Sequence, residues 1–208
     1  MTAPTDPADS MVARAMNSLY RRGYARTGGN VSVKRENRIF ITPSGASRDF
    51  GGRLRRVNIV ECDVQGKSYR SQPNLSPSRE IGIHCLIYAQ LDWATSIIHA
   101  HAAEVIAAAM MFDSVPALTE SAHKFPEILV IKNTSTLGTS QLLGVLSSEL
   151  SLNWFRAMHR PPYGACVLVE RHGLFVAGET LGHSLYFLEK LVENARIALA
   201  MASRAAQQ

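Results

Sequence analysis

The chain has 208 residues, of which 46% are hydrophobic and 19% are charged, a composition typical of one globular domain with a full core. We expect a single domain over residues 1–208. No apolar run approaches the roughly 20 residues that would span a bilayer, and residues 1–10 are polar and acidic, unlike a secretory leader. The sequence therefore predicts a cytoplasmic protein with no membrane partner.

The formal net charge is +5, and four arginines within residues 48–56 contribute much of this excess. A basic loop of this kind could face an anionic substrate or a nucleic acid. No nucleic-acid-binding motif or interleaved series of aromatic residues accompanies it. We therefore interpret the segment as a solvated loop and expect no nucleic-acid partner.

The apolar spacing predicts helices and strands that intermix along the chain. A helix at residues 11–20 is followed by a hairpin with strands at 31–33 and 38–42, and then by a strand at 57–64. A serine and a proline at positions 76 and 77 predict the capped start of a second helix. Later segments predict strands at 95–101, 127–131 and 165–169, and helices at 102–111, 138–152 and from about 180 to 199. This order predicts an α/β fold with a largely antiparallel or mixed central sheet flanked by helices.

His99 and His101 end the apolar strand predicted at residues 95–101. Residues i and i+2 of a strand point to the same face, so the two imidazoles would lie side by side. Two adjacent imidazoles suit a divalent metal ion, but a catalytic metal site needs at least a third ligand from elsewhere. From the spacing alone, either histidine could equally be a buried core residue with a hydrogen-bond partner.

His172 is the candidate third ligand, because it follows the buried-looking strand at 165–169 and precedes Gly173, which offers no steric obstacle. Alone, His172 could be a polar turn residue.

Glu80 is the candidate acid or base. Near a helix start its carboxylate could simply interact favourably with the positive end of the helix dipole. Beside a metal ion it could instead accept and donate a proton. His84 shares the helical face of Glu80, and we interpret it as a packing residue.

Three short loops offer hydroxyl and backbone N–H groups that could bind an anion. They contain Gly29 and Asn30, Ser44 and Gly45, and Ser78 and Arg79. Each loop alone is a weak indication, because glycine, asparagine and serine occur in any turn.

Taken together, these residues resemble the class II aldolase/adducin family. The resemblance rests on five pieces in order: residues 27–33 (TGGNVSV), 41–45 (ITPSG), 77–80 (PSRE), 99–101 (HAH) and 171–173 (RHG) before a long helix. It covers roughly residues 10–204. Each piece alone is unspecific, but the ordered set is specific.

The resemblance implies a three-layer α/β/α fold around a mostly antiparallel sheet. It implies one divalent metal ion per subunit (Zn²⁺, or else Mn²⁺, Co²⁺ or Fe²⁺) held by His99, His101 and His172. The catalytic glutamate of the family falls on Glu80, and its phosphate loops fall on Gly29, Asn30, Ser44, Gly45 and Ser78. Family members are usually homotetramers with sites at subunit interfaces, so a homotetramer is implied as well.

The implied activity is that of a metal-dependent, aldolase-type lyase acting on a small, anionic, phosphorylated hydroxy-ketone. The metal would stabilise the enediolate formed when a C–C bond is cleaved, and Glu80 would move the proton. Arg79 departs from the family pattern, which has a serine at this position. Its guanidinium could bind phosphate, or it could bind a carboxylate, which would fit the decarboxylases of the family.

Other activities on the same scaffold stay open. They are a decarboxylase, a methylthioribulose-phosphate dehydratase and a sugar-phosphate epimerase, although the epimerase branch has aspartate where this chain has Glu80. A non-catalytic, adducin-like interaction domain is a different class, and it needs neither the three histidines nor Glu80. Stoichiometric metal would separate the enzymes from the interaction domain.

Overall fold

The computed structural model describes residues 7–70, 73–120, 128–132, 139–148 and 164–205. Within them, nine strands form one sheet in the order β4-β3-β2-β1-β5-β9-β8-β7-β6. The strands are β1 (Gly29–Arg35), β2 (Arg38–Ile41), β3 (Val60–Asp63), β4 (Ser68–Arg70), β5 (Ser96–Ala100), β6 (Ser114–Val115), β7 (Ile128–Ile131), β8 (Ala165–Val169) and β9 (Gly173–Gly178). The helices are α1 (Ala8–Arg22), α2 (Ala46–Phe50), α3 (Ile81–Gln90), α4 (Ala103–Met111), α5 (Thr139–Leu146) and α7 (Leu181–Ala205), with a 3₁₀ turn η1 (Arg56–Asn58).

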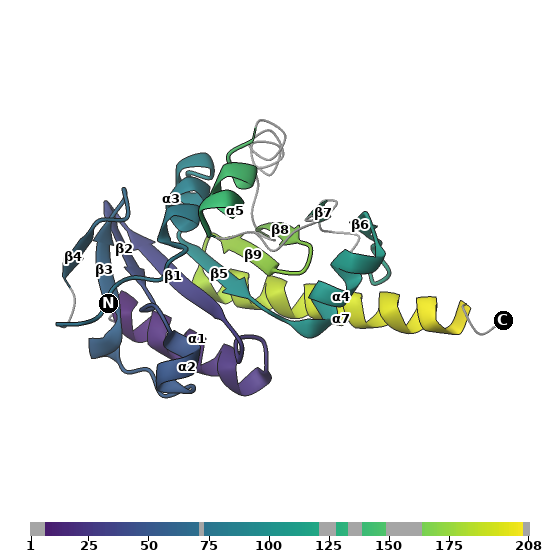
Figure 1. Cartoon of the computed structure of the whole chain (residues 1–208), viewed down its shortest axis with the longest axis horizontal. Coiled ribbons are helices and arrows are strands. Elements are labelled where there is room, and N and C mark those ends of the chain that lie inside the picture. Colours follow the sequence, from purple (N-terminus) through teal and green to yellow (C-terminus); the bar gives the residue numbers. More distant parts are fainter. Residues whose placement is uncertain (1–6, 71–72, 121–127, 133–138, 149–163, 206–208) are drawn as a thin grey trace, which may run out of the picture.

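Neighbouring strands run antiparallel throughout this sheet, except that β7 and β8 are parallel. Helices cover both faces (Figure 1). The first core lies between the sheet and α1, α4 and α7, and it contains Ile98 of β5. The second core lies between the sheet and α3 and α5, and it contains Ile97. Because side chains alternate along a strand, these neighbours enter opposite cores. The predicted α/β fold with a mostly antiparallel sheet and helices on both faces is confirmed.

The central strand β5 is buried along its whole length. It pairs with β1 on one side and with β9 on the other, and glycines on both neighbours lie against its end. A Cβ on Gly29 would lie 2.7 Å from the His99 carbonyl oxygen, and one on Gly173 would lie 2.4 Å from the Ala100 carbonyl oxygen. Both glycines also have positive φ angles, 116° and 147°, which residues with a Cβ rarely adopt. The two glycines therefore let β1 and β9 pack closely against the segment that carries His99 and His101.

Some predictions of local structure are wrong. The helix expected from position 76 begins at Ile81, because Pro77 forms a β-bridge with Pro43 and the Ser78 N–H donates to the Thr42 carbonyl. These bonds hold the preceding segment against the loop after β2.

The strand expected at 57–64 is shorter, because its first residues belong to the 3₁₀ turn η1.

The hairpin of β1 and β2, the strand β5 and the long last helix are confirmed. The helix expected at 138–152 ends earlier, at Leu146, and the Ser147 hydroxyl donates to the Leu143 carbonyl. The predicted strand position 127 and positions 138 and 149–152 of the predicted helix lie outside the described residues. None of the helices in the described part of the chain is long and apolar enough to cross a membrane.

We expect Gly173→Ala to lower the free energy of unfolding by about 1–3 kcal/mol, because alanine disfavours this backbone angle and its Cβ would meet the Ala100 carbonyl. Gly144→Ala is the matched control. Gly144 lies in α5 with open space around an added Cβ, so alanine should stabilise the protein by about 0.5–1 kcal/mol. Urea unfolding of both variants measures the difference. Wild-type stability of Gly173→Ala would contradict the need for this close strand approach.

Candidate functional site

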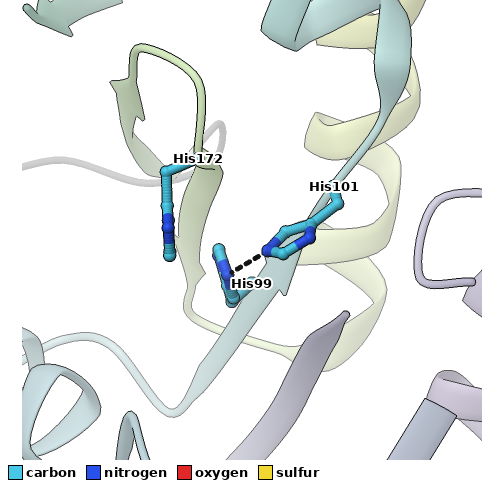
Figure 2. Close-up of side chains that lie close together, drawn as sticks. All are labelled: His99, His101 and His172. Carbon is cyan, nitrogen blue, oxygen red and sulfur yellow. Dashed lines mark hydrogen bonds between the residues drawn. The ribbon is translucent and has the colours of Figure 1, made fainter. Parts of the chain in front are cut away.

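Three imidazoles converge at one end of the sheet (Figure 2). His99 lies on β5, His101 follows its last residue, and His172 lies in the tight turn between β8 and β9. The His99 and His101 Nε2 atoms are 2.9 Å apart. One ring nitrogen from each of the three residues lies within 4.8 Å of the others. The histidines named from the sequence are thus brought together, and their donor atoms are spaced closely enough to surround one ion.

The turn that carries His172 has a local cause. Val169 and Gly173 are paired across β8 and β9, and the His172 N–H donates to the Val169 carbonyl at 3.1 Å. Arg171 takes a positive φ of 61° to close this turn. Because β9 also pairs with β5, the short turn places His172 beside the end of β5.

The chemistry of the histidines fits a metal ion. The His99 Nδ1–H donates to the Leu174 carbonyl at 2.9 Å, so its Nε2 carries a lone pair toward the cluster. Burial lowers the pKa of His99 to about 3, and burial also lowers the pKa of His101. Neutral imidazole is the form that binds metals. These residues could therefore hold a divalent cation without first losing a positive charge.

Glu80 closes the cluster from the start of α3. Its Oε1 accepts a hydrogen bond from His172 Nε2 at 3.0 Å, and its Oε2 accepts one from Asn30 Nδ2 at 2.6 Å and lies 3.3 Å from His99 Nε2. Burial alone would raise the pKa of this carboxyl, but the hydrogen bonds from His172 and Asn30 hold it below its ordinary value. The group is an ionised carboxylate beside the candidate metal ligands.

Glu80 owes its place to register and to the start of the helix. Asn30 of β1 is paired with His99 of β5, so their side chains share the face that α3 covers. Glu80 is the residue just before α3, and its carbonyl accepts the Ile83 and His84 N–H groups at 2.9 and 3.2 Å. The first turn of the helix therefore holds the glutamate backbone directly over the strand that carries Asn30.

A cavity of about 480 Å³ opens beside this cluster. The candidate anion-binding residues all line it, together with Glu80, His101 and His172; these residues are Gly29, Asn30, Ser44, Gly45, Ser78 and Arg79. Backbone pairing brings two of the loops together, because the Ser44 N–H donates to the Ser76 carbonyl and the Ser78 N–H donates to the Thr42 carbonyl. The three loops thus form one wall of a common cavity.

Three further polar residues that sequence reasoning did not assign to the site also line the cavity: Thr27, Ser47 and Arg48. Arg48 belongs to the basic segment that we interpreted as solvated. Its side chain is 83% exposed and pairs with Asp49 at 2.7 Å, so the solvated interpretation holds, yet the residue also borders the cavity. The available signals were its positive charge in a loop that could face an anionic substrate and its position three residues after Gly45.

His84 packs beneath this site, away from the three-histidine cluster. It is fully buried, and its Nδ1 lies 2.7 Å from the Ser32 hydroxyl. The interpretation as a packing residue agrees with this environment. Burial lowers the pKa of His84 to about 3, so the ring is neutral.

Comparisons with known proteins agree with this fold. Residues 10–199 match the family described as "Class II Aldolase and Adducin N-terminal domain". This protein belongs to that family. The chain is 25% identical to the methylthioribulose-1-phosphate dehydratase of Komagataella phaffii, a match covering 95% of this chain and 83% of the relative. It is 26% identical to the L-fuculose phosphate aldolase of Methanococcus vannielii, covering 86% and 88%.

A solved L-fuculose 1-phosphate aldolase has the same fold, with a TM-score of 0.77 at 23% sequence identity. The match covers 97% of this chain and 88% of that one. The family resemblance expected from the sequence is confirmed. The relatives carry two different activities in their names, so membership fixes the scaffold and leaves the reaction to be argued from the site.

We expect His84 to make the metal-free protein less stable in acid. The unfolded chain takes up a proton on this residue below a pKa of about 6.5, whereas the folded chain does so only below about 3. The contribution of the neutral His84 ring to the free energy of unfolding is therefore fully present above pH 6.5. Below that pH the free energy of unfolding falls by up to about 1.4 kcal/mol per pH unit. Between pH 7 and 5, the wild type should lose about 2 kcal/mol more than His84→Leu in urea unfolding. Equal losses would show that the ring is not held neutral.

Proposed function

We propose that this protein is a metal-dependent, aldolase-type lyase that cleaves or forms a C–C bond in a small phosphorylated hydroxy-ketone. The observation that carries the proposal is the meeting of His99, His101 and His172 with the ionised Glu80. The cluster borders a cavity lined by anion-binding loops. This combination supplies a cation site, a base and an anion site within one cavity.

His99, His101 and His172 would hold one divalent metal ion, which we propose to be Zn²⁺, with Mn²⁺, Co²⁺ and Fe²⁺ as alternatives. Bound there, the ion would act as a Lewis acid for negative charge that develops next to a substrate carbonyl. The hydrogen bond from His99 Nδ1 to Leu174 supports this role, because it fixes the ring that would face the ion.

The anionic end of the substrate would lie among the Ser44, Gly45 and Ser78 loops, with the exposed Arg79 guanidinium beside them. Hydroxyl and backbone N–H groups suit phosphate, and a guanidinium can bind two of its oxygens at once. Asn30 adds a further contact. Its Nδ2 is committed to Glu80, and its Oδ1 is buried without a hydrogen-bond partner among the described residues, so a substrate hydroxyl would satisfy it.

Glu80 would move the proton. As an ionised carboxylate it can take a proton from substrate carbon or oxygen and return it. Its hydrogen bonds from Asn30 and His172 hold the two oxygens in defined directions. This fixed orientation favours proton transfer over a short distance to and from one position of the substrate.

A dehydratase is the second candidate, and the similarity to the Komagataella phaffii enzyme favours it. Loss of water next to a carbonyl also develops negative charge beside the cation and needs a base, so the same residues would serve. A decarboxylase would use Arg79 for a substrate carboxylate.

We also propose that the protein is cytoplasmic and forms a homotetramer. Exposed apolar side chains on α4 and α7 support the assembly; they are Met110, Met111, Ile197 and Met201.

We expect the metal-loaded protein to catalyse deuterium exchange at C3 of dihydroxyacetone phosphate, monitored by NMR. A chelator should abolish it, and Glu80→Gln should slow it by at least about 100-fold, because general base catalysis contributes about 10²–10⁴. Glu104→Gln is the matched control, since Glu104 pairs with Arg196 on the surface. Full metal occupancy without exchange would contradict an aldolase and favour the dehydratase or the decarboxylase.

We expect His99→Ala and His172→Ala each to weaken metal binding by more than about 100-fold, because even outer-shell partners account for about 10- to 100-fold. Metal analysis after dialysis against Zn²⁺ should give one ion per wild-type chain. His183→Ala is the control, because this partly exposed histidine lies on α7 beside Glu179. Wild-type metal content in either test variant would remove that residue from the ligand set. A wild-type protein without stoichiometric metal would favour an interaction domain.

A further inference from the structure

A second polar cluster lies directly below the site, inside the core between the sheet and α3. The Ser32 hydroxyl of β1 lies 2.7 Å from His84 Nδ1 and 2.8 Å from the Tyr88 hydroxyl. Ser32 and His84 are fully buried, and Tyr88 is 6% exposed. None of the three lines the cavity. Their hydrogen bonds therefore join the strand to the helix without touching the substrate space.

The cluster repeats the contact that holds Glu80. Asn30 and Ser32 are two residues apart on β1, about 6.6 Å along a strand. Glu80 and His84 are four residues apart at the start of α3, about 6 Å along a helix. These spacings match, so the Asn30–Glu80 bond and the Ser32–His84 bond form two parallel links between the same two elements.

The links add a directional constraint to an otherwise apolar contact. Around them, α3 contributes Ile83 and Ile87 to the core against the sheet. Apolar packing has no preferred direction, whereas a hydrogen bond loses strength when its geometry changes. The network therefore fixes the position of α3 along β1 more narrowly than packing alone.

His84 is also not an efficient way to fill a core. Its Nε2 is buried without a hydrogen-bond partner among the described residues, which costs stability. An apolar side chain would avoid this cost, as buried polar groups are often replaceable without loss of stability. The cost of burying this polar side chain is consistent with a role for its hydrogen bond to Ser32 in holding α3 in position.

We propose that Ser32, His84 and Tyr88 are positioning residues for the reaction: they hold the first turn of α3 in place so that Glu80 stays between Asn30, His99 and His172. This inference rests on the proposed role of Glu80 as the base. The loops at 43–45 and 76–78 have their own backbone bonds, so substrate affinity depends little on the network.

The test compares Ser32→Ala and Tyr88→Phe with Ser96→Ala in the full-length protein. Ser96 is an equally buried serine, hydrogen-bonded to Ser184 at 2.7 Å. It is paired in register with Val33, so it faces the opposite core. All three substitutions remove one buried hydroxyl group. The two serine hydroxyls each make two hydrogen bonds, Ser32 with His84 and Tyr88, and Ser96 with Ser184 and the Gly178 carbonyl, and the control is on the opposite face of the sheet from α3.

The first readout is independent of activity. The Ile83 and His84 amides both donate to the Glu80 carbonyl, so their hydrogen exchange reports the first turn of α3. We expect at least about tenfold faster exchange in Ser32→Ala, a smaller increase in Tyr88→Phe, and no selective increase in Ser96→Ala.

The second readout is the deuterium exchange of dihydroxyacetone phosphate. In Ser32→Ala, kcat should fall at least about tenfold while KM stays within about twofold, because the base moves and the anion loops do not. Wild-type amide exchange, or a kcat loss no larger than in Ser96→Ala, would overturn the proposal. An inactive wild type would count against the proposed function instead, and the amide comparison would still decide the positioning role.

Discussion

The placement of β5 between β1 and β9 is the constraint on which the rest of the site depends. Glycine backbones at positions 29 and 173 lie against its last residues and leave no space for a Cβ. Antiparallel pairing then sets Asn30 opposite His99 on one side, and on the other side it sets the turn with His172 beside the same strand end. Three segments far apart in the chain thereby deliver the histidines and the amide to one point. A shift of one residue in either ladder would turn these side chains to the other face.

Burial and charge within this arrangement reinforce one another. Burial keeps His99 neutral, while the hydrogen bonds from Asn30 and His172 favour the ionised form of Glu80. Neutral imidazoles and a carboxylate are the states required of metal ligands and of a base. The electrostatics of these side chains thus suit a cation, and a bound cation would take over the contacts that Glu80 makes with the histidines.

Much of this could be predicted from the sequence because its signals are local. The His-x-His pair on an apolar strand predicted two rings on one face, and the structure places both at the end of β5. The start of α3 was mispredicted, because a proline bridge from Pro43 to Pro77 holds that segment. No local pattern reports such a long-range bond. The same limit applies to the position of Arg48 at the cavity. It also applies to the Ser32–His84 contact, which joins residues 52 positions apart.

The central claim is that three imidazoles from two strand ends surround one cation beside Glu80. An anomalous-difference map at the zinc edge, from crystals grown with Zn²⁺, tests it most directly. The account predicts a single strong peak about 2.0–2.1 Å from one ring nitrogen each of His99, His101 and His172. The claim would be contradicted if the three rings turned away from one another. It would also be contradicted if the zinc peak lay elsewhere and no peak lay between the three rings.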